Sequence, residues 1–136
     1  MTENIDSSSL FRNYILFCLL YSTAHGAVDA VLAYSTTELG DTAGSNGSFA
    51  LYILYTVSAL LLAKPVLRKL GPKYAIFCGL CGMLVYVASF FIAIQTPSHA
   101  NAIFTTGGIC GGFGAGMLWP AQVMTFSVKM VRDGQH

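Results

Sequence analysis

Four long apolar stretches dominate the chain, and short polar segments separate them. Residues 14–34 contain a single charged residue, Asp29, and residues 48–63 contain none. Residues 74–128 are also uncharged, with a polar break at residues 95–101. Because a bilayer core about 30 Å thick needs about 20 apolar residues in a helix, this pattern predicts four transmembrane spans. They cover about residues 13–34, 48–67, 74–95 and 101–128.

The pattern indicates an all-α membrane protein with short tails at both ends. Residues 1–12 are expected to form an N-terminal tail, residues 13–128 a four-helix transmembrane region, and residues 129–136 a C-terminal tail. A helix that is apolar on all its faces over this length fits a bilayer better than the core of a soluble domain. Glu3 and Asp6 stand where a cleavable signal peptide would carry basic residues, so the first span is expected to be an uncleaved anchor.

Composition supports this class and excludes others. Hydrophobic residues make up 54% of the chain and charged residues 10%, whereas soluble domains carry about 25% charged residues. A net charge of +1 provides no basic surface for a nucleic acid. The four cysteines all lie in predicted spans, and the C-x-x-C pair Cys78 and Cys81 has no second pair or histidine beside it. We therefore expect these thiols to pack against other helices, with no metal or cofactor bound.

The basic residues predict the orientation of the spans. The connecting segments 35–47 and 96–100 contain neither Lys nor Arg. Since basic residues are retained in the cytosol, both termini are predicted to be cytoplasmic and these two segments to face the opposite side. That side would also carry the sequon at Asn46, a candidate glycosylation site. The residues predicted on the cytoplasmic side are Arg12, Lys64, Arg68, Lys69, Lys73, Lys129 and Arg132.

One group of polar residues is predicted to lie within the membrane. Tyr21, His25 and Asp29 are spaced four residues apart and share one face of the first span. An acid in hydrocarbon is costly, so Asp29 is expected to face the bundle interior, where it and His25 could couple protons or bind a cation. In the alternative interpretation, Asp29 lies about one turn from the outer end of its span and reaches water or caps a neighbouring helix. Gln122 in the fourth span is a further polar partner for a neighbouring helix.

The fourth span carries a row of glycines. Gly108, Gly112 and Gly116 form two overlapping G-x-x-x-G units on one helix face, which lets a second helix approach closely. We expect this face to mediate internal helix packing, with self-association as the alternative. The glycine-rich run does not predict a nucleotide loop, because no Lys-Ser/Thr pair follows it. Trp119 and Pro120 are expected near the cytoplasmic headgroups.

Several short motifs occur in an order that resembles one membrane protein family. They are Glu38-Leu39-Gly40, Leu51-Tyr52-Ile53-Leu54-Tyr55, Leu70-Gly71-Pro72-Lys73 and Gly114-Ala115-Gly116-Met117-Leu118-Trp119-Pro120-Ala121-Gln122. Over about residues 11–127, the chain resembles the opening third of the Unc-ninety-three family, the "uncoordinated" ion-channel regulators within the major facilitator superfamily. The resemblance implies the first four helices of a twelve-helix fold. It also implies a role in regulating or trafficking a partner membrane protein such as an ion channel or receptor.

The basic turn between the second and third spans is similar to the superfamily's G-x-x-x-D-R-x-G-R-K loop in a degenerate form. Lys69, Gly71 and Lys73 match that pattern, whereas Lys64 replaces the first glycine and Arg68 replaces the aspartate. The missing acid removes the salt-bridge latch that the resemblance would imply for an active transporter. Four spans against twelve would make the chain either a fragment or short product, or an independent four-helix unit.

The sequence leaves three functional interpretations. The leading one is a multi-pass regulator of the Unc-ninety-three type, in contact with the lipid bilayer and a partner membrane protein. The second is a small-solute or proton-coupled transporter of the major facilitator superfamily that uses His25 and Asp29, and the third is a truncated product that inserts without function. Enzyme activity is not expected, because no nucleophile has an adjacent base and His99 stands apart from other ligand residues.

Overall fold

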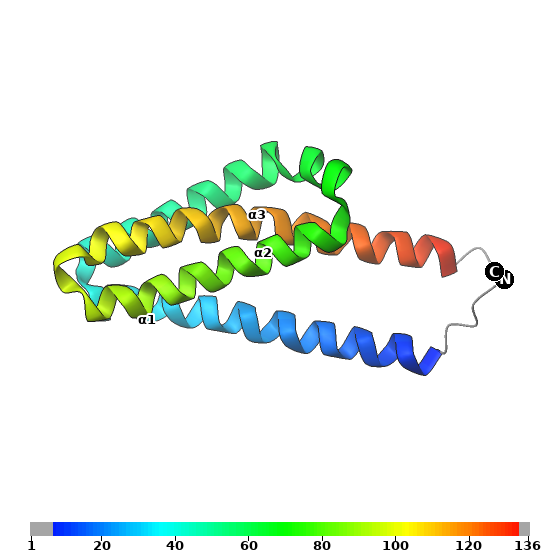
Figure 1. Cartoon of the computed structure of the whole chain (residues 1–136), viewed down its shortest axis with the longest axis horizontal. Coiled ribbons are helices and arrows are strands. Elements are labelled where there is room, and N and C mark those ends of the chain that lie inside the picture. The colour runs from blue at the N-terminus through cyan, green and yellow to red at the C-terminus, as the bar shows by residue number, and fades with distance from the viewer. Residues whose placement is uncertain (1–6, 134–136) are drawn as a thin grey trace.

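The computed structural model describes residues 7–133, which form three long α-helices (Figure 1). The first, α1, spans Ser7–Leu61; α2 spans Ala63–Gln95; and α3 spans Ala100–Asp133. A short 3-10 helix, η1 (Pro97–His99), connects α2 to α3. Its first residue is proline, whose fixed φ suits the start of a helix and whose missing N–H is not needed there.

Two glycines divide the first two helices into arms. Gly40 has φ 80° and ψ 161°, and Gly71 has φ 78° and ψ 163°, a backbone region that is essentially restricted to glycine. At Gly40 the chain reverses, so that α1 consists of a first arm (residues 7–39) and a second arm (residues 41–61) that runs back in the opposite direction and diverges from the first (Figure 1). In α2, Pro72 directly follows Gly71 and begins a new helical segment, where its missing N–H is again not needed.

The prediction of four separate helices is not supported, because the described residues contain three long helices. The first two predicted spans, 13–34 and 48–67, begin in the two arms of α1. The segment 35–47, expected as a loop, is helical on both sides of Gly40, because a single glycine makes the reversal while its neighbours keep their helical hydrogen bonds. The second predicted span also runs past the end of α1, since Leu62 separates α1 from α2.

The helices agree with the predicted all-α membrane class. Three segments are long and apolar enough to cross a membrane, namely Tyr14–Leu61, Ala63–Gln95 and Pro97–Met124. Large apolar side chains on α1 and α2, such as Leu60 and Leu84, are exposed on the outside of the bundle. An apolar exterior of this extent suits contact with lipid, whereas soluble monomers rarely expose large continuous apolar patches.

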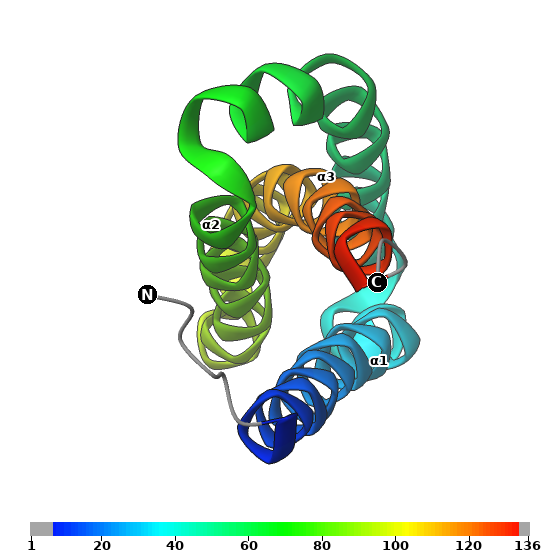
Figure 2. The ribbon, with the colours of Figure 1, turned by 90° about the vertical axis from the view of Figure 1, so that its right-hand side faces the viewer.

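Helix α3 occupies the centre of the bundle. It contacts both α1 and α2 extensively, whereas α1 and α2 contact each other far less, and the end view shows α3 among the arms of the other helices (Figure 2). Its glycines allow this close approach. A Cβ added to Gly112 would lie 2.5 Å from the carbonyl oxygen of Leu51 in α1, and one added to Gly114 would lie 2.7 Å from the carbonyl oxygen of Gly79 in α2.

The glycine row predicted as a packing face lies against the second arm of α1. Gly108 contacts the backbone of Gly47, and Gly116 contacts Ser58. The hydroxyl of Ser58, which is fully buried, donates a hydrogen bond of 3.2 Å to the carbonyl oxygen of Gly112. The row is therefore covered within the same chain, which places it in internal packing.

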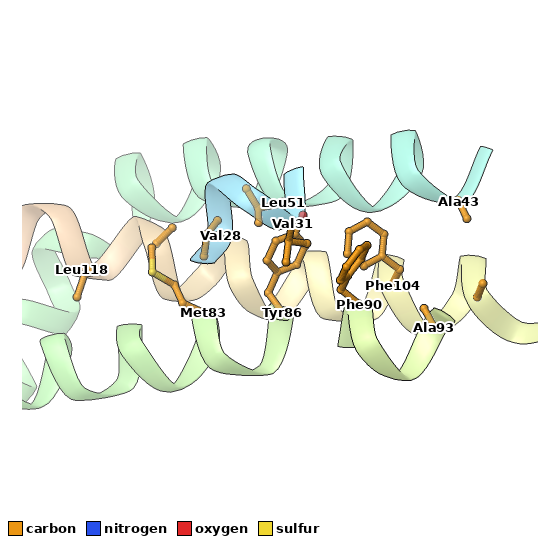
Figure 3. Close-up of a cluster of buried hydrophobic side chains, with 12 residues drawn as sticks. Val28, Val31, Ala43, Leu51, Met83, Tyr86, Phe90, Ala93, Phe104 and Leu118 are labelled. Atoms are coloured by element: carbon orange, nitrogen blue, oxygen red, sulfur yellow. The ribbon is translucent and has the colours of Figure 1, made fainter. Parts of the chain in front are cut away.

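Aromatic side chains from α2 and α3 fill the middle of the core. The ring of Phe104 stacks on Tyr86 at a centroid distance of 5.2 Å and contacts Phe90 at 5.9 Å. Tyr86 and Phe104 are fully buried. Figure 3 shows Tyr86 directed from α2 toward Val31 and Leu51 of α1. The core thus joins all three helices and holds Tyr86 between them.

Replacing Gly40 by alanine is expected to destabilise the protein by about 1–3 kcal/mol, because alanine does not readily adopt this backbone conformation. Gly26→Ala is the matched control. A Cβ at either glycine meets no atom within 4 Å, but of the two only Gly40 has a positive φ. Thermal unfolding of both purified variants in detergent micelles measures the difference. Equal stability would contradict the view that the reversal depends on a glycine at this position.

Candidate functional site

An aromatic and acidic cluster lies between the first arm of α1 and α3. Tyr21, His25 and Asp29 occupy successive turns of one face of α1. The Nε2 of His25 and the Oδ2 of Asp29 are 4.0 Å apart, and the ring of Tyr21 stacks on that of His25 at a centroid distance of 6.1 Å. The structure therefore brings together three of the four residues that the sequence proposes for an intramembrane polar site.

Trp119 of α3 joins this cluster, although the sequence places it near the headgroups. Its ring is almost perpendicular to the rings of Tyr21 and His25, with a centroid distance of 5.6 Å to each. Edge-to-face contacts of this kind are a favoured aromatic geometry. The periodicity of a single span carries no signal for this contact, because the contact depends on how α1 and α3 pack together.

Asp29 lies farther from the end of its helix than expected. The first arm continues to residue 39, so Asp29 precedes the reversal at Gly40 by about three helical turns rather than about one. Its side chain is 63% exposed and that of His25 is 40% exposed. The end of the helix and the end of the apolar stretch at about residue 34 therefore do not coincide.

A cavity of about 270 Å³ opens beside Asp29 and receives side chains from all three helices. Val28 and Met83 contribute apolar surface to its wall. Among the described residues, Asp29 is the only acid that lines the cavity. No Lys or Arg of the described chain lines it, so Asp29 faces no permanent cation there. The polar and aromatic residues of the wall are His25, Asp29, Tyr52, Tyr55, Tyr86 and Trp119.

Several polar atoms at this site have no hydrogen-bond partner among the described residues. The hydroxyl of Tyr86 is one of them, and the whole residue is buried. The hydroxyl of Ser48 lies near it. The hydroxyl of Tyr21 and the Nδ1 of His25 are buried and unpartnered in the same way. An unpaired buried polar group is costly, and two of these residues, His25 and Tyr86, line the cavity.

Gln122 lies outside this cavity. It is half-buried on α3, and its Oε1 is buried without a hydrogen-bond partner within residues 7–133. Gln122 follows Trp119 by about one helical turn, so its side chain lies on the next turn of α3. The structure therefore does not bring it into the cavity wall with the three polar residues of α1.

The predicted basic turn lies at one end of the bundle. Lys64, Arg68, Lys69 and Lys73 are exposed, and none forms an ion pair with another described residue. Gly71 makes the bend between them with its positive φ. The junction of α1 and α2 lies at the same end as the start of α1 and the end of α3 (Figure 1).

The remaining sequence candidates lie apart from the cavity. The Nδ2 of Asn46 donates a hydrogen bond of 3.0 Å to the Oδ1 of Asn101, so the amide proposed for glycosylation links α1 to α3. Cys78, Cys81 and Cys110 are exposed as free thiols, so the expectation that the cysteines pack against other helices is wrong for these three. Among the described residues, no three His, Cys, Asp or Glu side chains come together as metal ligands.

Comparison with known proteins supports the membrane class. No family model matches the chain, and no solved structure is similar to it. The chain is 29% identical over 121 residues to a Schizosaccharomyces pombe protein described as "Uncharacterized membrane protein C6F6.04c". The match covers 83% of this chain and 23% of that protein, so the chain spans less than a quarter of the relative's length. Together with the long apolar helices, this similarity identifies an integral membrane protein.

Removing the hydroxyl of Tyr86 is expected to stabilise the protein. Tyr86→Phe deletes a buried polar group that has no hydrogen-bond partner in the described residues, and we expect a gain of about 1 kcal/mol. Tyr74→Phe is the matched control, because it removes the same hydroxyl group from an exposed residue on the same helix. Melting temperatures in detergent micelles compare the two variants. A lower melting temperature for Tyr86→Phe than for the wild type would mean that the hydroxyl is hydrogen-bonded in solution.

Proposed function

We propose that the chain is a multi-pass membrane unit of the Unc-ninety-three type that regulates or traffics a partner membrane protein such as an ion channel. The observation that carries this proposal is the exposure of Asp29 on the side of an otherwise apolar bundle. A carboxylate at bilayer depth must face protein or water, because hydrocarbon cannot solvate it. A partner helix packed over the first arm of α1 would keep Asp29 and His25 away from lipid.

The exposed surface around Asp29 supports this interpretation. The segment containing α1 is the least buried of the three apolar segments. Gly26 and Ala33, about one turn before and one turn after Asp29, are exposed small residues on the same side of the helix. Helices associate in membranes through close packing of small residues together with a few interhelical polar contacts. The first arm offers both, since Gly26 and Ala33 let a partner helix approach and Asp29 can accept hydrogen bonds from it.

We further propose four membrane crossings with both termini in the cytosol. The reversal at Gly40 turns α1 into two arms that run in opposite directions, which supports a count of four. The basic turn at Lys64–Lys73 lies at the same end of the bundle as the start of α1 and the end of α3 (Figure 1). Basic residues are retained on the cytosolic side, so that end is the cytosolic one.

Cysteine labelling tests this topology. In a variant whose four native cysteines are replaced by serine, Thr42→Cys and Lys69→Cys each place one thiol at an exposed position at opposite ends of the bundle. In sealed vesicles with the cytosolic face outward, a membrane-impermeant maleimide is expected to label Lys69→Cys directly. Thr42→Cys should react only after detergent is added. Labelling of both positions from the same side would contradict the four-crossing topology.

A photocrosslinker on the first arm tests the partner. Placed at Ala33, one turn after Asp29, it is expected to capture a membrane protein whose cellular level falls when this chain is deleted and recovers with the wild type. The same crosslinker at Leu84, exposed on α2, is the control and should not capture that protein. Asp29→Leu should weaken both the crosslink and the recovery, because it removes the polar contact.

The small-solute or proton-coupled transporter is the second candidate, and the cavity beside His25 and Asp29 favours it. The crosslinking experiment and an uptake assay distinguish the regulator from the transporter. Crosslinks to lipid alone at Ala33, with no membrane protein changing its level, would contradict the regulator. Solute uptake by proteoliposomes that contain only this chain would then favour transport.

A further inference from the structure

We propose that the cavity beside Asp29 binds a small protonated amine with an apolar body. The inference goes beyond the regulatory role, because it concerns a ligand of this chain alone and requires no partner protein. The cavity measures about 270 Å³, slightly less than the roughly 300–1,000 Å³ of sites for drug-sized ligands. Its volume therefore suits a small molecule.

The charge of the wall selects a cation. Asp29 is its only acidic residue, and no Lys or Arg of the described chain lines it. The 4.0 Å between Asp29 and His25 is too long for a direct hydrogen bond, so the carboxylate keeps its capacity to accept hydrogen bonds from a ligand. Anions would meet this carboxylate with no Lys or Arg of the described chain to compensate it.

The aromatic residues of the wall favour the same ligand class. Tyr52 and Tyr55 come from the second arm of α1, Tyr86 from α2 and Trp119 from α3. The electron-rich faces of such rings attract ammonium groups, and the attraction is stronger when water is excluded. Val28 and Met83 add apolar surface, which would contact the hydrocarbon part of an amine.

The unpartnered hydroxyl of Tyr86 favours a ligand that carries N–H groups. Tyr86 is fully buried, lines the cavity and lacks a hydrogen-bond partner among the described residues. Tyr52 and Tyr55 also line the cavity, so three phenol side chains contribute to its wall. A protonated primary amine can donate to such oxygens and to Asp29, whereas a quaternary ammonium has no hydrogen to donate.

The wall does not suit a divalent metal ion. Calcium and magnesium require several oxygen ligands around one point, and the wall supplies one carboxylate. Among the described residues, no group of three metal-ligating side chains occurs. An organic cation, held by aromatic rings and a few hydrogen bonds, needs no such set of ligands.

Trp119 provides a direct test, because it is the only tryptophan in the chain and lines the cavity. The full chain in lipid nanodiscs is titrated with cyclohexylammonium, cyclohexanol and cyclohexanecarboxylate, which share a ring and differ in charge. Sodium chloride of matched ionic strength is the control. We expect a saturable change in tryptophan fluorescence with the ammonium compound alone. An equal response to cyclohexanol or to sodium chloride would overturn the proposal.

Three variants separate binding from folding. Asp29→Asn is expected to weaken binding of cyclohexylammonium at least tenfold, because the ligand loses its only negative partner. Tyr86→Phe is expected to weaken it severalfold while the melting temperature rises, and Tyr74→Phe should change neither. Unchanged binding in Asp29→Asn or in Tyr86→Phe would overturn the proposal. That failure would leave the proposal of a partner protein unaffected, because crosslinking at Ala33 detects a bound protein and does not depend on the amine.

Discussion

Close approach between the glycines of α3 and the backbones of its neighbours is the contact on which the bundle depends. Gly112 lies against Leu51 of α1, and Gly114 lies against Gly79 of α2. Between helices in lipid there is little hydrophobic driving force, so association relies on dispersion and on short backbone distances. The hydrogen bond from Ser58 to Gly112 strengthens one of these contacts. Helix α3 is central because its small residues fit against both neighbours at once.

The same small residues produce the cavity. Gly111 and Ala115 of α3 line it, and a Cβ added to Gly111 would lie 2.7 Å from the Cβ of Tyr86. Tyr86 therefore packs tightly at its base, while its hydroxyl is buried without a hydrogen-bond partner among the described residues. Tight packing against α3 and a cavity lined by Tyr86 thus occur in one arrangement of helices.

Asp29 connects the two proposals through different parts of its surroundings. Its side chain lines the cavity and is also 63% exposed on the side of the bundle. A protonated amine would satisfy the carboxylate from within the cavity, and a partner helix would cover it from outside. Both arrangements would give Asp29 the polar partner that a charge at bilayer depth needs.

The sequence by itself determined the features that depend on local spacing and on transfer into lipid. These are the apolar helical class, the common face of Tyr21, His25 and Asp29, and the glycine row of α3. Periodicity did not reveal the helical segment around Gly40, because its polar residues suggested a loop. The backbone there can satisfy its hydrogen bonds within each helical arm, so the polar side chains do not interrupt it.

Tertiary structure alone decided which helices meet and therefore which residues form the site. Trp119 and Tyr86 join the polar residues of α1, whereas Gln122 does not. These residues lie far apart in the sequence, and their contacts depend on the crossing and rotation of whole helices. The close packing of small residues along α3 determines this crossing and rotation. The hydrophobic periodicity of one helix contains no information about how a neighbouring helix is placed against it.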